Sequence, residues 1–160
     1  MANMQTAAQG APVMDEAAMA EMRRLIFEAP IQELADAQGI SIDEAVQLRV
    51  EKNLEESTRW YKRGAEAGGP RCMCDYGLHL LHGVGAERRP EEGVEWLLQA
   101  EEQEYPYAIF VLGWCSEMGE GLPQDWGKAV ERYQRAADLG EAAAMKSLGL
   151  CYENGTGVAK

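Results

Sequence analysis

The chain has 160 residues, and 27 acidic against 15 basic residues give it a formal net charge of −12. Such a charge argues against a nucleic-acid backbone or an anionic membrane surface as partner, because both would repel the protein. No segment has the length and apolarity of a membrane span, and the first residues lack the pattern of a signal peptide, so we expect a cytoplasmic protein. Good helix formers dominate and β-branched residues are sparse, which favours an all-α fold.

In chain order, residues 1–13 are predicted to be disordered. The next segment, as far as Glu28, has apolar residues at the spacing of an amphipathic helix: Met14, Ala18, Met22, Leu25 and Ile26. Pro30 interrupts that helix, and a second, short helix is expected to end before Gly39. We expect residues 14–52 to cap the repeats described below, because an end repeat leaves a hydrophobic face open.

Two candidate helix starts follow. Ser41 with Glu44 three residues later has the pattern of a capping box, and Asn53 with Glu56 repeats that pattern. However, no glycine turn precedes Asn53. The alternative is therefore one unbroken helix that runs from the first capping box to about Ala67.

A pattern of three glycines recurs twice, each time 36 residues further on: Gly77, Gly83 and Gly85; Gly113, Gly119 and Gly121; Gly149, Gly155 and Gly157. The residues that could bind a metal do not recur, since His79 becomes Cys115 and Cys151, and Cys72 becomes Ala108 and Ala144. Glycines that recur among changing side chains belong to the scaffold. Each unit is therefore predicted to be a helix, a glycine turn and a second helix.

The middle copy gives the clearest boundaries. Its first helix is expected from Tyr107 to Met118, and its second begins after Asp125, a good N-cap, and ends before Gly140. Gly113 lies in the middle of the first helix, where glycine costs about 1 kcal/mol relative to alanine. We expect two helices to cross closely at that point.

The middle copy resembles a Sel-one-like repeat (SLR), a relative of the tetratricopeptide repeats, through Ala108, Leu112, Gly113, Gly119, Gly121, Asp125, Lys128, Ala129, Tyr133, Arg135, Ala136, Ala137 and Gly140. The third copy matches through Ala144, Leu148, Gly149, Tyr152, Gly155, Gly157 and Val158. The resemblance covers residues 53–160 and implies a short α-solenoid, a scaffold or adaptor for other proteins without catalysis or cofactor. We expect a half repeat at 53–69, repeats at 70–105 and 106–140, and a truncated repeat at 141–160.

The stretch CMCDYGLHLLHGVG offers a competing metal hypothesis. Cys72, Asp75, His79 and His82 would form one stripe of a helix, and zinc binds such ligands. Packing is the preferred interpretation, because cysteine occupies the position of His79 in the other copies. No arrangement of serine, histidine and acid suggests an enzyme.

The resemblance also bears on the four cysteines. Exported cysteine-rich relatives pair cysteines across the two helices of a repeat, at positions that here hold Met73, Ile109 and Met145 against Ala65, Glu101 and Ala137. We therefore expect free thiols in a reducing compartment. The acidic run Glu101, Glu102 and Glu104 is either a docking patch or, as we favour, a solvated helix end.

A second apolar stripe on the first helix of the middle copy is the main functional signal. Its members are Tyr107, Phe110, Val111, Trp114 and Met118, and the 36-residue step adds Leu78, Leu81, His82 and Leu150. We expect these residues to line a concave groove that binds a peptide or helix of a protein partner. The alternatives are that the chain's own N-terminal helix fills the groove, or that packing between neighbouring helices hides the stripe.

The third copy lacks its second helix in this sequence. Either the sequence is cut short within this repeat, or another chain covers its first helix, with Ala144, Leu148 and Tyr152; we expect self-association to a homo-oligomer through this end. Two further function classes stay open at this point. One is an oligomeric structural component assembled through open solenoid ends, and the other is a metal or redox sensor built on the first copy.

Overall fold

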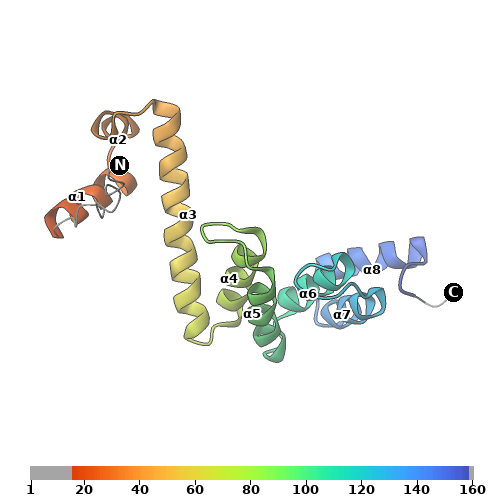
Figure 1. Ribbon diagram of the computed structural model, residues 1–160. Helices are drawn as coiled ribbons and strands as arrows, with labels where there is room; N and C mark the ends of the chain where they lie inside the picture. Colours follow the sequence, from red (N-terminus) through yellow and green to blue (C-terminus); the bar gives the residue numbers. More distant parts are fainter. Residues whose placement is uncertain (1–15, 159–160) are drawn as a thin grey trace, which may run out of the picture. The chain divides into compact units, whose positions relative to one another are not determined.

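A computed structural model describes residues 16–158 of the protein (Figure 1). The described residues form eight α-helices and no strand, which confirms the all-α expectation. They belong to two compact units, with the boundary between Lys52 and Asn53. No described helix combines the length and the apolarity that crossing a membrane requires. The segment 1–13, predicted to be disordered, lies outside the described residues.

The described part of the first unit contains α1 (Glu16–Phe27), α2 (Ile31–Gln38) and the start of α3 (Ile42–Glu66). Gly39 ends α2 with a left-handed φ of 66°. A small core joins the three helices through Leu25, Ile26, Ala29, Leu34, Ala35 and Ala45. The helices of this unit were therefore predicted from the spacing of apolar residues and from the breaks at Pro30 and Gly39.

The start and the course of α3 decide between the two interpretations of this region. The Ser41 hydroxyl accepts a hydrogen bond from the Glu44 amide at 3.2 Å, and the Ser41 amide donates to the Glu44 carboxylate at 2.8 Å, so the capping box is confirmed. Asn53 lies in the middle of α3 and caps nothing, so its interpretation as a helix start is wrong. Because no glycine turn interrupts it, the helix continues to Glu66.

The second unit continues with α4 (Pro70–His82), α5 (Pro90–Glu102), α6 (Pro106–Met118), α7 (Trp126–Asp138) and α8 (Ala142–Asn154). Each helix packs on the next, and α4 also contacts α6 (Figure 1). The unit is an α-solenoid of helix pairs, as expected. Asp125 caps α7, because its carboxylate accepts a hydrogen bond from the Lys128 amide at 3.0 Å.

Glycines set the spacing between helices and repeats. A Cβ on Gly113 would lie 2.7 Å from the Tyr133 ring, and one on Gly77 would lie 2.7 Å from the Gly93 carbonyl oxygen, so the close crossings are confirmed in two copies. The turns pack with similar closeness. A Cβ on Gly121, whose φ is 66°, would lie 2.6 Å from the carbonyl oxygen of Pro90. Pro90 begins α5, the second helix of the preceding repeat.

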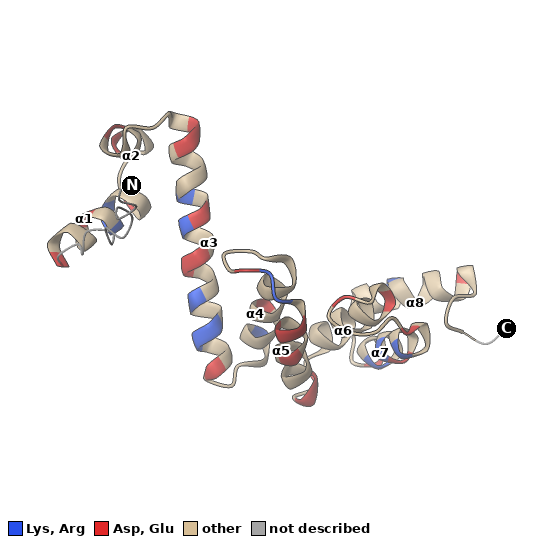
Figure 2. Ribbon diagram, in the orientation of Figure 1, with Lys and Arg blue, Asp and Glu red and all other residues tan. Residues whose placement is uncertain are grey.

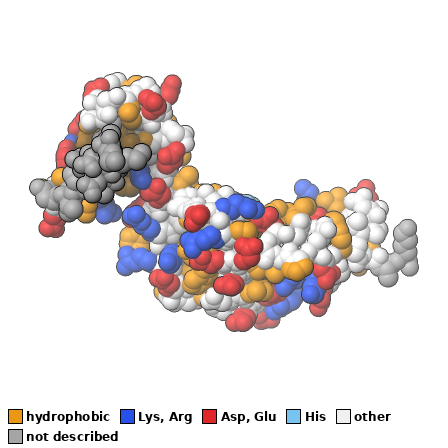
Figure 3. Space-filling model, viewed as in Figure 1, with side chains coloured by type: hydrophobic (Ala, Val, Ile, Leu, Met, Phe, Trp, Pro, Cys, Tyr) orange, Lys and Arg blue, Asp and Glu red, His pale blue; other side chains and the backbone are white. Residues whose placement is uncertain are grey.

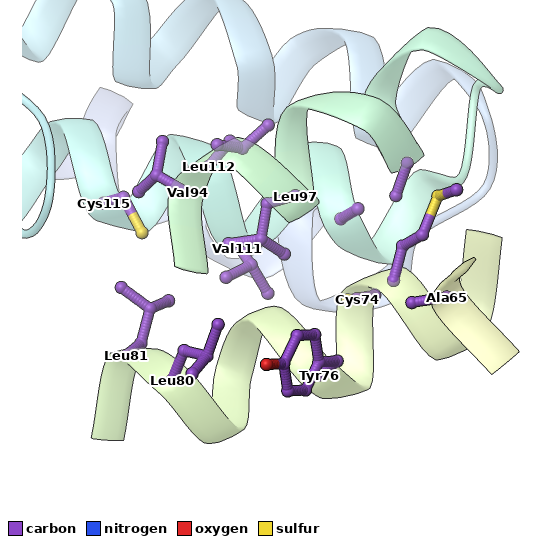
Figure 4. Packing of buried hydrophobic residues seen from close by; sticks show 13 residues of the cluster. Ala65, Cys74, Tyr76, Leu80, Leu81, Val94, Leu97, Val111, Leu112 and Cys115 are labelled. Carbon is purple, nitrogen blue, oxygen red and sulfur yellow. The ribbon is translucent and has the colours of Figure 1, made fainter. Parts of the chain in front are cut away.

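The main core lies between α4, α5 and α6 and contains residues that the repeat assigns to the interior (Figure 4). Leu112, Ala108 and Cys115 are fully buried, as predicted, and Ile109 is buried against Ala136 and Ala144. Figure 4 shows Leu80 and Leu81 of α4 pointing toward the side of α6 that carries Val111. These contacts hold the first helices of successive repeats side by side.

Candidate protein-binding surface

Seven of the nine predicted partner-binding residues retain exposed surface, and we call them the apolar stripe: Leu78, His82, Tyr107, Phe110, Trp114, Met118 and Leu150. Met118 is 54% exposed, Leu150 47% and Tyr107 38%, and His82 is exposed as well, whereas Leu78, Phe110 and Trp114 are partly buried. On the face of the second unit in Figure 3, hydrophobic side chains lie in patches among charged ones.

The other two predicted residues do not belong to this surface. Leu81 is 1% exposed and Val111 is 4% exposed, and both belong to the core between α4, α5 and α6. Their assignment to an open groove is wrong, because packing between successive first helices covers them. Packing between neighbouring helices therefore buries two of the nine predicted residues, and it leaves the apolar stripe at least partly exposed.

Aromatic contacts connect the stripe residues of α4 and α6 and attach them to α7. The rings of His82 and Trp114 are 6.0 Å apart and join α4 to α6. The Phe110 ring lies 5.9 Å from Tyr107 and 5.7 Å from Tyr133, and it also packs on the clusters that contain residues of α8. Such contacts hold the aromatic side chains in place, so little conformational freedom would be lost if a partner bound to them.

The stretch CMCDYGLHLLHGVG is held by packing and hydrogen bonds. The Nδ1 atom of His79 lies 2.6 Å from the hydroxyl of buried Thr58, and its ring meets the Tyr61 ring edge-on at 5.1 Å. Burial lowers the pKa of His79 despite the opposing charge of Asp75. In residues 16–158, no group of three or more His, Cys, Asp or Glu side chains is placed to hold a metal.

All four cysteines are free thiols in the structure. Burial raises the pKa of Cys74 to about 12, and it does the same for Cys115. Burial also raises the pKa of Cys151, with a further contribution from the nearby Glu117 carboxylate. These thiols are therefore protonated in the folded protein at neutral pH.

The acidic run at the end of α5 is neither free nor fully solvated. The Glu101 side chain is only 16% exposed and lies 3.2 Å from Arg135 and 3.5 Å from Arg132. Arg135 also reaches Glu104 at 3.9 Å. Figure 2 shows acidic residues on α5 and basic residues on α7. The solvated helix end that we favoured is wrong for Glu101, because the basic residues of the next repeat partly cover and pair with it.

A pocket that the sequence analysis missed lies where α6, α7 and α8 meet. Its volume is about 300 Å³, and its walls are Glu117, Trp126, Ser147, Leu150, Cys151, Asn154 and Thr156. Because Leu150 belongs to both, the pocket adjoins the apolar stripe. The 36-residue step contained the signal, since buried Leu81 in the first copy becomes Glu117 in the middle copy.

The repeats of this chain match those of a known protein family. The family model of the Sel1 repeat matches residues 47–69, 70–105, 106–141 and 142–160. A curated relative is chitin synthase regulatory factor 3 of Schizosaccharomyces pombe, which is 32% identical over 143 residues. That match covers 87% of this chain and 14% of the relative, so the chain spans a small part of that protein's length.

Three bacterial proteins with solved structures have the same fold. A Sel1 repeat protein from Oxalobacter formigenes is 31% identical with a TM-score of 0.63, and the match covers 92% of this chain and 55% of that one. A protective antigen of uropathogenic Escherichia coli with an SLR fold is 27% identical with a TM-score of 0.62, over 80% of this chain and 29% of that one. Cysteine rich protein B of Helicobacter pylori, at 15% identity and a TM-score of 0.52 over 83% of this chain and 92% of that one, shares the fold alone.

Proposed function

Because the chain belongs to the Sel1 repeat family, whose helical repeats bind other proteins, we propose that it is a non-catalytic scaffold or adaptor with an apolar groove for a partner segment. The apolar stripe along α4, α6 and α8 would line this groove, with Trp114 and Phe110 near its centre. The name of the fungal relative, a regulatory factor, is in keeping with a role through binding. A cytoplasmic location remains part of the proposal.

The distribution of buried and exposed residues on α6 is the observation that supports this proposal most. Seven of its residues are buried: Ala108, Ile109, Val111, Leu112, Gly113, Cys115 and Ser116. Yet the same helix leaves Tyr107 and Met118 exposed and Trp114 and Phe110 only partly covered. A helix that is apolar nearly all round is stable when both faces are covered, and a partner segment would provide the second cover.

Selection of phage-displayed peptides on the purified chain tests this proposal. Peptides with apolar or aromatic residues are expected, and Trp114→Ala should weaken their binding at least roughly thirtyfold, equivalent to about 2 kcal/mol. Trp60→Ala is the matched control, because Trp60 is 58% exposed and lies outside the stripe. Equal effects of the two substitutions would move the partner site away from the stripe. Stronger binding after deletion of residues 1–28 would instead indicate that the N-terminal helix competes for it.

A second candidate function is assembly with other copies of the chain through α8. Met145 is 51% exposed and Tyr152 is 62% exposed, and no atom from outside α8 lies within 4 Å of a Cβ built on Gly149 between them. Light scattering at several protein concentrations should then show an oligomer that Tyr152→Glu dissociates. A single mass, that of the monomer, at every concentration would remove this candidate.

A further inference from the structure

The pocket between α6, α7 and α8 lies where the repeats differ, and three of the differing lining positions belong to one packed group in the preceding repeats. Between the first and the middle copy, buried Leu81 and Val111 pack with the partly buried Trp114. One repeat later, the same positions hold Glu117, Ser147 and Leu150. The replacements are shorter or polar and leave about 300 Å³ empty. That volume is at the small end of ligand sites and suits one long side chain better than a whole ligand.

The charge inside the pocket comes from Glu117. Its Oε2 atom accepts a hydrogen bond from the Tyr133 hydroxyl at 2.6 Å, and the Tyr133 ring is buried, so the carboxylate is held in place. Among the described residues, no lysine or arginine forms an ion pair with Glu117. Arg132 is engaged elsewhere, because it donates to Ser116 at 2.8 Å and pairs with Glu101.

We infer that this pocket binds the guanidinium group of an arginine side chain from the partner segment, an inference that rests on the proposed function. Glu117 supplies a fixed carboxylate with one free oxygen. Because this carboxylate is partly shielded from water, a hydrogen-bonded cation stabilises its charge more than the remaining water does. Trp126 and Leu150 supply apolar walls. An indole is also the kind of ring on which a planar guanidinium stacks. The choice of arginine over lysine follows from this combination of a carboxylate and an aromatic wall.

The test uses two small probes and one pair of variants. Nα-acetyl-arginine methylamide carries the guanidinium, and the matching citrulline compound is its neutral analogue of the same shape. Binding is followed through the Trp126 indole and Leu150 amide signals in NMR spectra of the full chain at physiological salt. Glu117→Gln removes the charge and keeps an acceptor for Tyr133. Glu153→Gln is the matched control, because Glu153 occupies the same repeat position in α8 and is exposed.

The arginine probe should bind at least tenfold more tightly than the citrulline probe, and Glu117→Gln should remove this preference while Glu153→Gln keeps it. Equal binding of the two probes, or an equal effect of the two substitutions, would overturn the inference. Equal binding of Nα-acetyl-lysine methylamide would refute the choice of arginine. Trp114→Ala should leave probe binding unchanged, so a failure of this pocket is distinguishable from a failure of the apolar stripe as the partner site.

Discussion

Gly113 and Gly149 occupy the same repeat position in very different surroundings, and alanine at each should change stability in opposite directions. A helix gains about 1 kcal/mol when alanine replaces an interior glycine. At Gly149, nothing lies within 4 Å of the new Cβ, so most of that gain should appear as added stability. At Gly113, the new Cβ would lie 2.7 Å from two carbons of the Tyr133 ring. Tyr133 is 1% exposed, and its hydroxyl is bound to Glu117, so the ring has little room to move.

Overpacking of a buried site typically costs about 1–3 kcal/mol, which outweighs the helix gain at Gly113. With the helix gain of about 1 kcal/mol subtracted, the net loss should be up to about 2 kcal/mol for Gly113→Ala, against a gain of up to about 1 kcal/mol for Gly149→Ala. Urea unfolding of dilute protein, followed by circular dichroism, measures both. With a slope of about 2 kcal/mol per molar urea, the two midpoints should separate by roughly 1 M. Midpoints that move in the same direction would show that close helix crossing is not the reason for Gly113.

Three further predictions concern stability, pH and thiol chemistry. Leu112→Ala should cost about 2–5 kcal/mol of unfolding free energy and Trp114→Ala clearly less, because Leu112 is fully buried and Trp114 is not; similar denaturant midpoints would contradict this difference. The lowered pKa of His79 means that the unfolded chain binds the proton more readily, so its contribution to stability is complete above about pH 6.5 and decreases as the pH falls toward the folded-state pKa. Comparison of wild type with His79→Gln between pH 7.5 and roughly pH 5 isolates this effect, and parallel stability curves would show that His79 is not responsible. All four thiols should react with a disulfide reagent in denaturant, whereas in the folded protein partly exposed Cys72 should react first and the buried three slowly: Cys74, Cys115 and Cys151. A denatured count of two or none would indicate disulfides.

The repeat period predicted most of the second unit because glycine turns and caps act locally. Asp125 and Gly113 are examples, since a cap and a close crossing each depend on a residue type at a fixed offset. The prediction of a helix start at Asn53 was wrong because a residue of the N-cap type lies inside a helix when no turn precedes it. Local signals therefore sufficed where a turn residue was present.

The candidate site was harder to predict because exposure depends on the neighbouring repeat. Leu81 and Val111 have the apolar character of stripe residues, but the α4–α6 contact buries them. Glu101 belongs to an acidic run, but its partners are two arginines more than thirty positions away. The pocket beside Glu117 is lined by shorter or polar side chains at three positions, and this difference becomes visible when the copies are compared residue by residue.

The turn glycines couple the folding of successive repeats. Gly121 contacts the start of α5 through the Pro90 carbonyl, and Gly157 contacts the start of α7 through the Trp126 carbonyl, each so closely that a Cβ would lie 2.6 Å from the oxygen. Each turn thus adds contacts that stabilise two neighbouring repeats together. The free energy of opening one repeat therefore depends on whether the next repeat is folded. The middle repeat has described neighbours on both sides and should open most rarely, with the slowest amide hydrogen exchange in α6. The backbone beneath Trp114 would then be the part of the second unit that fluctuates least.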